Sequence, residues 1–303
     1  MKLEFNIQNV TVTEFGVGRD TGAQQAFVTV PVDTAVQAVL REMVQATWDA
    51  LQKDEDGPSL YEPSEKHGST EYLYLPLGND LASAVRELHD AKSLSIDTHV
   101  LADPSDVFCY FTRLTDNSQR RLTAVRRASQ FKGVLKSRNR LVRMLDDTLQ
   151  IIEDTVFKLD SDFDLIVDSS SVHILRPSGF EFAGKLQQAI LEAVPQNVAR
   201  IQKELAFVAF EGIGQYVGKH PRAARYLASI CAQKETTNID KALLKRLCKQ
   251  TGIEVAESKG TLTVADGHEM GFLEVLDRRR YEVSLVKEKP EQYRAASRRK
   301  ING

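Results

Sequence analysis

Residues 162–175 read DFDLIVDSSSVHIL. The apolar residues at 163, 165 and 167 alternate with neighbours that include three aspartates, which is the period of a strand with one buried face. Three serines at 169–171 then supply a turn, and the apolar residues of 172–175 lead the chain back. The stretch therefore predicts a β-hairpin whose first strand is half exposed at the edge of a sheet.

Helix and strand patterns extend outward from this hairpin in both directions. On its N-terminal side lie strand patterns over 3–12 and 27–30, a helix over 33–51 capped by Asp33, a strand over 72–75, a helix capped by Asn79, and a strand over 107–111. On its C-terminal side lie a helix from residue 180 that Pro195 must bend or interrupt, helices over 220–232 and 240–250, a hairpin over 253–264, and helices over 268–277 and 290–299. We therefore predict an α+β fold of small mixed sheets with helices, in two domains, residues 1–112 and a helix-rich 113–303.

The length and composition indicate an ordinary folded protein. At 303 residues, the chain is long enough to bury a full hydrophobic core. It has no apolar run of about 18 residues that could span a membrane, and its first residues, MKLEFNIQ, lack the apolar stretch of a secretory signal. Its three cysteines have no CxxC spacing, which indicates a reducing compartment. These features predict a cytoplasmic protein.

The net charge of −2 conceals a strong segregation of charge along the chain. Residues 1–112 carry 7 basic and 18 acidic side chains, whereas residues 113–143 carry 10 basic side chains and one acid, Asp116. The sign reverses over 144–168, with one basic and eight acidic side chains, and residues 278–303 are basic again, with nine against three. Such separation creates strong local fields in a nearly neutral protein.

The basic segment, residues 113–143, suits an anionic polymer. Arginine predominates there, and its planar fork can grip phosphate oxygens in pairs, while each neutralised phosphate releases counterions whatever the base sequence. The DNA-binding residues that we predict are Arg113, Arg120, Arg121, Arg126, Arg127, Lys132, Lys136, Arg138, Arg140 and Arg143, extended by Arg298, Arg299 and Lys300 of the C-terminal tail. Because no helix-turn-helix, zinc-finger or RNA-recognition motif accompanies them, we expect little sequence specificity. A helix and a ribbon of strands fit the segment equally well, and these arginines could instead pair with carboxylates of the same molecule.

No catalytic motif stands out, so we predict no catalytic residue, no metal and no cofactor. One alternative is a metal-dependent nuclease that uses Asp162, Asp164 and Glu181, since two adjacent carboxylates on a strand face can share a cation with a third ligand. Asp168 is too far from Asp162 to join them, at about 20 Å along an extended strand. Another alternative is a protein–protein adaptor that binds no DNA at all.

Three stretches taken together resemble the KwaB family of Kiwa anti-phage defence systems. They are FKL at 157–159 followed by DFDLI at 162–166, VHI at 172–174 leading to FE at 180–181, and FLEVL at 272–276 followed by Tyr281, Tyr293 and Ile301. The resemblance implies a bacterial protein that binds invading phage DNA, obstructs its replication or expression, and forms a homodimer. It also implies recruitment to the inner membrane by a KwaA-like multi-span membrane protein.

Overall fold

The computed structural model divides the chain into two compact units. The residues it describes are 5–20, 22, 25–54, 57–68, 71–98, 106–128, 142–145, 148–151, 159–233, 238–286 and 289–296. Unit 1 comprises residues 1–60 and 69–186, and unit 2 comprises residues 61–68 and 187–303. The boundary predicted after residue 112 falls inside strand β6 (Val107–Asp116) of unit 1, so the chain divides at other positions.

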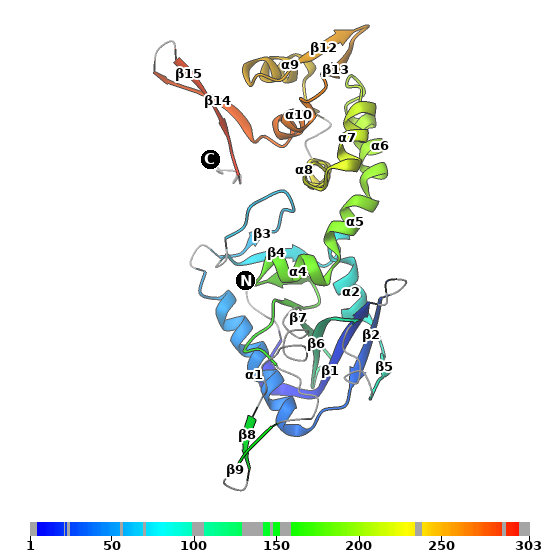
Figure 1. The fold of residues 1–303 in the computed structure, drawn as a ribbon, viewed down its shortest axis with the longest axis vertical. Coiled ribbons are helices and arrows are strands. Elements are labelled where there is room, and N and C mark those ends of the chain that lie inside the picture. Colours follow the sequence, from blue (N-terminus) through cyan, green and yellow to red (C-terminus); the bar gives the residue numbers. More distant parts are fainter. Residues whose placement is uncertain are drawn as a thin grey trace. The chain divides into compact units, whose positions relative to one another are not determined.

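Unit 1 is built on a mixed sheet, which within the described residues has nine strands in the order β3-β4-β11-β10-β7-β6-β1-β2-β5 (Figure 1). Besides β6, these are β1 (Val10–Asp20), β2 (Gln25–Val30), β3 (Ser59–Leu60), β4 (Leu73–Pro76), β5 (Ser95–Ile96), β7 (Arg121–Arg127), β10 (Leu165–Val167) and β11 (Ser171–Ile174). Neighbours pair antiparallel except β2 with β5 and β3 with β4. Together with the helices of both units, the sheet confirms the α+β class.

The hairpin predicted from residues 162–175 lies in the middle of this sheet. Leu165 pairs with Ile174, and Val167 pairs with Val172. The expected half-exposed edge strand is wrong, because β10 lies between β11 and β7 and all three of its residues are fully buried. The apolar run Leu165–Val167 is what a strand covered on both faces requires.

Helices cover both faces of the sheet in unit 1. Helix α1 (Thr34–Leu51) begins at Asp33, whose carboxylate accepts the N–H of Val36 at 2.8 Å, as the sequence predicts. Its buried residues share one core with Leu122 and Ala124 of β7. Helices α2 (Ser83–Asp90) and α4 (Pro177–Ala183) contact β7 on the other face. The remaining elements are η1 (Ile7–Asn9), η2 (Asp80–Ala82) and the hairpin of β8 (Val142–Leu145) with β9 (Thr148–Ile151).

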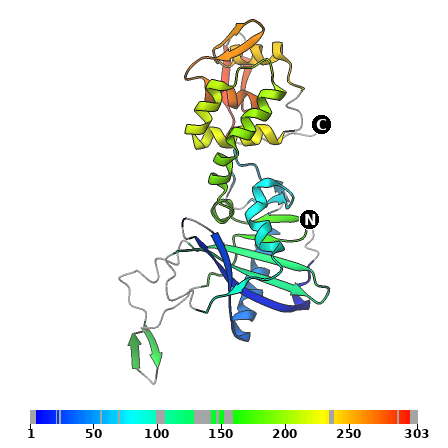
Figure 2. The same ribbon diagram turned by 90° about the vertical axis from the view of Figure 1, so that its right-hand side faces the viewer.

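Unit 2 is mostly helical. Its elements are α5 (Leu186–Glu192), which begins at the division, α6 (Val194–Glu204), α7 (Glu211–Lys219), α8 (Pro221–Ala232), α9 (Lys241–Gln250), β12 (Val255–Ser258), β13 (Thr261–Val264), α10 (Glu269–Leu276), β14 (Arg280–Val286) and β15 (Lys289–Arg294). Helix α8 is central, since α6, α7 and α10 all contact it (Figures 1 and 2). The helices predicted near 220–232, 240–250 and 268–277 are confirmed. The helix predicted over 290–299 is wrong, because β15 occupies most of the described part of that range.

A buried ion pair joins residues 61–68 to the rest of unit 2. The side chains of Arg279 and Asp277 have no exposed surface, and Arg279 Nε donates to an Asp277 oxygen at 2.6 Å. Arg279 also donates to the hydroxyl of Ser64 at 2.9 Å and to the carbonyl of Ala296 at 2.6 Å. Breaking a buried pair of this kind leaves an uncompensated charge, so Arg279 supports the fold.

Candidate nucleic-acid interface

The described arginines of the basic segment lie on the hairpin of β6 and β7. Because successive side chains of a strand point to opposite faces, Arg121 and Arg127 share one face of β7 and Arg126 lies on the other. The turn between the strands is held by Asp116, whose carboxylate accepts the N–H groups of Ser118 and Arg120, each at 2.9 Å. Of the two conformations left open by the sequence, residues 121–127 adopt the strand.

Arg113 and Arg121 converge on the end of helix α2. Both donate to the carbonyl oxygen of Ala91 at 2.7 Å, and Arg121 also donates to the carbonyl of His89 at 2.8 Å. The last carbonyl groups of a helix lack partners within the helix and carry its partial negative charge. Two arginines at this end satisfy these carbonyls and interact favourably with the helix dipole. Arg113 is only 1% exposed and pairs with Glu14 at 2.7 Å. Its predicted place on an open surface is therefore wrong.

Arg126 is enclosed by three aspartates on the opposite face of the sheet. Its guanidinium lies 3.2 Å from Asp160, 3.1 Å from Asp162 and 3.0 Å from Asp164, and its side chain is 15% exposed. Arg176 adds a second cation, 2.8 Å from Asp162. Internal pairing with carboxylates, which the sequence left open, is thus the observed arrangement for Arg126.

The same contacts bear on the nuclease alternative. Asp162 and Asp164 do lie together, but both are neutralised by arginines, while Glu181 lies in α4. Asp164 is 3% exposed, and this burial raises the pKa of its carboxyl group. The hydrogen bond from the Arg127 N–H and the charges of Arg126 and Arg176 act to lower the pKa, but burial outweighs them. Among the described residues, no group of three His, Cys, Asp or Glu side chains could hold a metal ion.

Arg120 and Arg127 differ from Arg113, Arg121 and Arg126 in their surroundings. Arg120 is 48% exposed and pairs with Asp116 at 2.8 Å, four residues earlier in the chain. Arg127 is half-buried at the last residue of β7, and its guanidinium carbon lies 4.1 Å from the ring centroid of Phe182 in α4. Among the described residues no carboxylate pairs with the Arg127 guanidinium, and its buried Nε has no hydrogen-bond partner there. Within the described part of the chain, the charge of Arg127 is therefore not neutralised.

The other predicted residues fall mostly outside the described residues. These are Lys132, Lys136, Arg138, Arg140, Arg298, Arg299 and Lys300. Arg143 lies on β8, where it pairs across the hairpin with Gln150. The structure thus brings Arg113 with Arg121, leaves Arg127 on a separate part of the same face, and directs Arg126 to the opposite face.

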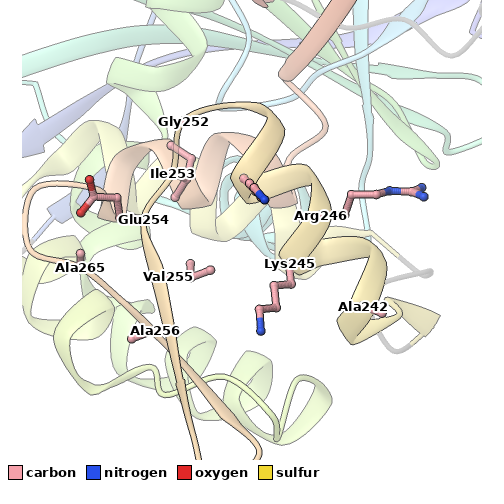
Figure 3. Close-up of a pocket in the computed structure, with 10 residues that line it drawn as sticks. Ala242, Lys245, Arg246, Gly252, Ile253, Glu254, Val255, Ala256 and Ala265 are labelled. Atoms are coloured by element: carbon pink, nitrogen blue, oxygen red, sulfur yellow. The ribbon is translucent and has the colours of Figure 1, made fainter.

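A second set of cations escaped the sequence-based prediction. Helix α9 carries Lys241, Lys245, Arg246 and Lys249 without an acidic residue, and the last three line a hollow of about 860 Å³ beside β12 (Figure 3). The one-signed charge of this helix was a signal available in the sequence. The position of the apolar wall opposite this helix could not be predicted, because Ile253, Val255 and Ala256 come to lie beside α9 only in the folded unit.

Within the described residues, no helix is both long and apolar enough to cross a membrane. The three cysteines are buried and form no disulfide.

The comparisons with known proteins agree with the resemblance noted in the sequence. A family model described as Kiwa protein KwaB-like matches residues 105–285, which include all of β6 and all but the last residue of β14. This span is more than half of the 303-residue chain. No curated protein and no solved structure matches the chain. The chain therefore belongs to the KwaB-like family of Kiwa proteins, which are components of anti-phage defence.

Proposed function

We propose that this protein binds DNA with little sequence specificity and thereby obstructs the replication or expression of phage DNA. We assign the binding to Arg127 and to the basic residues that follow it in the sequence. We include four of these residues as DNA contacts on the basis of the sequence alone, namely Lys132, Lys136, Arg138 and Arg140.

The observation that carries the proposal is the state of Arg127. Its guanidinium is not neutralised by a carboxylate of the described chain, unlike those of Arg113, Arg120 and Arg126. It rests on the ring of Phe182, which is itself 38% exposed. A cation held on an aromatic face keeps its N–H donors directed to other acceptors, and a phosphate diester supplies such acceptors. In the sequence, Arg127 is followed by Lys132, Lys136, Arg138, Arg140 and Arg143 with no acidic residue among them.

The internal contacts of three arginines narrow the set of DNA-binding residues that the sequence predicts. Arg113, Arg121 and Arg126 are engaged in holding α2 and the aspartate cluster, so we assign them to the support of the hairpin. Arg120 can contribute to the local field at its half-exposed position, although Asp116 offsets its charge. A surface made of Arg127 and the residues after it would contact phosphates rather than base edges, which accounts for weak specificity.

We further propose that the protein acts by binding and not by catalysis, and that it works as a homodimer with a membrane-embedded KwaA-like partner. Its site of action would then be the cytoplasmic face of the inner membrane. Membership of the KwaB-like family supports this arrangement, because a Kiwa system implies partner components.

Retention of the full-length protein on immobilised duplex DNA, measured over a range of salt concentrations, tests the proposal. For a protein that contacts phosphates, the logarithm of the binding constant falls with the logarithm of the salt concentration by about 0.9 per contacted phosphate. This slope should be the same for duplexes of unrelated sequence. The adaptor alternative predicts no salt-dependent retention. Incubation of supercoiled plasmid with Mg²⁺ or Mn²⁺ separates binding from nuclease activity, since a binder leaves the plasmid intact.

A further inference from the structure

A groove lies between helix α9 and strand β12 in unit 2. Figure 3 shows Lys245 and Val255 extending into the space between the helix and the strand. Ile253, Val255 and Ala256 give the groove apolar walls, and Lys245, Arg246 and Lys249 add three cations. An apolar hollow with a few charged groups at its border is the general character of a site that recognises a ligand.

The charges around the groove leave a positive surplus. The carboxylate of Glu257 on β12 forms ion pairs with the ammonium groups of Lys241, at 2.5 Å, and Lys245, at 2.6 Å. Hydrogen bonds from these two cations lower the pKa of the Glu257 carboxyl group to about 2. Arg246 and Lys249 are exposed and have no ion pair among the described residues. Among the described residues that line the groove, three cations, Lys245, Arg246 and Lys249, accompany one carboxylate, Glu254. The groove therefore attracts a negatively charged partner.

Strand β12 offers a free edge to this groove. Strands β12 and β13 are joined by a two-residue turn at Lys259 and Gly260, both with positive φ, which makes the flanking residues Ser258 and Thr261 a hydrogen-bonded pair. Hydrogen-bonded and non-hydrogen-bonded pairs alternate along an antiparallel ladder, so the backbone N–H and C=O groups of Val255 and Glu257 point away from β13. The backbone of Leu262, which lies opposite Glu257, likewise points away from its partner strand. Its N–H donates to the carbonyl of Phe207 and its carbonyl accepts the N–H of Ala209, each at 2.8 Å. In the described part of the chain, no third strand pairs with β12.

We propose that this groove binds an acidic segment of another protein chain, rich in alternating apolar residues, as a β-strand added to β12. Backbone groups of Val255 and Glu257 would pair with the segment, its apolar side chains would cover Ile253 and Val255, and its carboxylates would meet Arg246 and Lys249. Addition of a strand to a sheet edge beside a helix is a general mode of peptide recognition. The proposal is independent of DNA binding by unit 1.

The surroundings of the groove favour a peptide over a nucleic acid. The groove combines Ile253, Val255 and Ala256 with Lys245, Arg246 and Lys249. Apolar side chains next to cations match a partner that has both apolar and acidic groups. A duplex backbone offers phosphates but nothing that would cover this apolar wall.

Fluorescence anisotropy with the full-length protein tests the proposal. The probe is a labelled peptide of about ten residues in which glutamate alternates with valine, a length that suits a strand. We expect saturable binding that weakens with salt, no binding of the matching lysine–valine peptide, and about tenfold weaker binding of a peptide N-methylated on alternate residues, because N-methylation removes the donors for strand pairing. We also expect about tenfold weaker binding by the double variant R246E/K249E.

The matched control is K203E/K219E, which makes the same charge change at two exposed lysines of unit 2 that do not line the groove. It should bind the glutamate–valine peptide as the parent does. Melting curves followed by circular dichroism establish that both variants are folded. Absence of peptide binding by the parent, or equal binding by the parent and both variants, overturns the proposal. A loss of duplex DNA binding in R246E/K249E with peptide binding unchanged would assign the groove to nucleic acid and also overturn it.

Discussion

The guanidinium of Arg127 lies over the ring of Phe182, 4.1 Å from its centroid. Phe182 in turn contacts Phe108 of β6, with ring centroids 6.4 Å apart, so the cation rests on an aromatic side chain that is anchored to the sheet. The backbone N–H of Arg127 donates to Asp164 at 2.8 Å, which fixes the end of β7. Arg127 is thus a positioned charge and not a mobile surface residue.

Replacing Arg127 with alanine should weaken DNA binding by a similar factor for duplexes of unrelated sequence. Loss of one phosphate contact lowers the slope of log affinity against log salt concentration by about 1. Lys203→Ala on α6 removes an exposed positive charge from unit 2 and should leave both quantities unchanged. A sequence-dependent loss in Arg127→Ala would indicate base contacts instead.

Arg126→Gln should destabilise the protein by about 3 kcal/mol, because three carboxylates would lose the cation that they share. The free energy of unfolding in urea measures this effect. Arg126 is assigned here to the fold, so DNA affinity of the folded variant should match that of the parent. Unchanged stability together with lost DNA binding would instead make Arg126 a DNA contact.

Gly179→Ala should destabilise the protein by about 1–3 kcal/mol. A Cβ at Gly179 would lie 2.2 Å from a carboxylate oxygen of Asp164, which Arg126 and Arg176 hold in place. Gly218→Ala in α7 is the matched control, since its Cβ would meet nothing within 4 Å, and it should stabilise the helix by about 0.5–1 kcal/mol. Thermal unfolding of the two variants should therefore shift in opposite directions.

Asp168 should make the stability of unit 1 depend on acid pH. Burial acts to raise its pKa, but hydrogen bonds from His173, at 3.0 Å, and from the N–H groups of Ser170 and Ser171 outweigh burial and lower the pKa to about 2. A folded-state pKa below the unfolded value of 3.8 adds stability that is complete above about pH 4 and disappears as the pH falls through 2. Asp168→Asn should cost about 2 kcal/mol at pH 7 and remove this part of the acid dependence. Urea unfolding at pH 7 and pH 3 measures both effects, and an equal loss at the two pH values would contradict them.

Local signals in the sequence predicted several elements because they depend on neighbouring residues alone. Asp33 caps α1 as expected, and Pro195 separates α5 from α6 by occupying the first turn of α6, where its missing N–H has no cost. The predicted helix over 290–299 failed because β15 pairs with β14, where Tyr293 stacks on Tyr281, and such long-range pairing outweighs local propensity.

The candidate site was predictable only in part. The sequence showed that residues 113–143 are basic, but the carboxylates that pair with Arg113 and Arg126 come from distant segments. Arg113 pairs with Glu14, and Arg126 pairs with aspartates 34 to 38 residues later. Burial therefore depends on strand order in the sheet, which no local pattern contains. The same reason applies to the groove at α9, whose cations were visible in the sequence and whose opposite wall was not.

DNA binding through Arg127 and the residues after it is tested by titrating a labelled duplex with a five-fold variant. In this variant glutamate replaces Arg127, Lys132, Lys136, Arg138 and Arg140. The control reverses five exposed cations of unit 2, namely Lys203, Lys219, Arg222, Arg246 and Lys249. We expect the first variant to bind duplexes of any sequence about a hundredfold more weakly than the parent and with a flatter salt dependence, while the control stays within about threefold. Equal DNA binding by the first variant and the parent would rule out DNA binding through these residues.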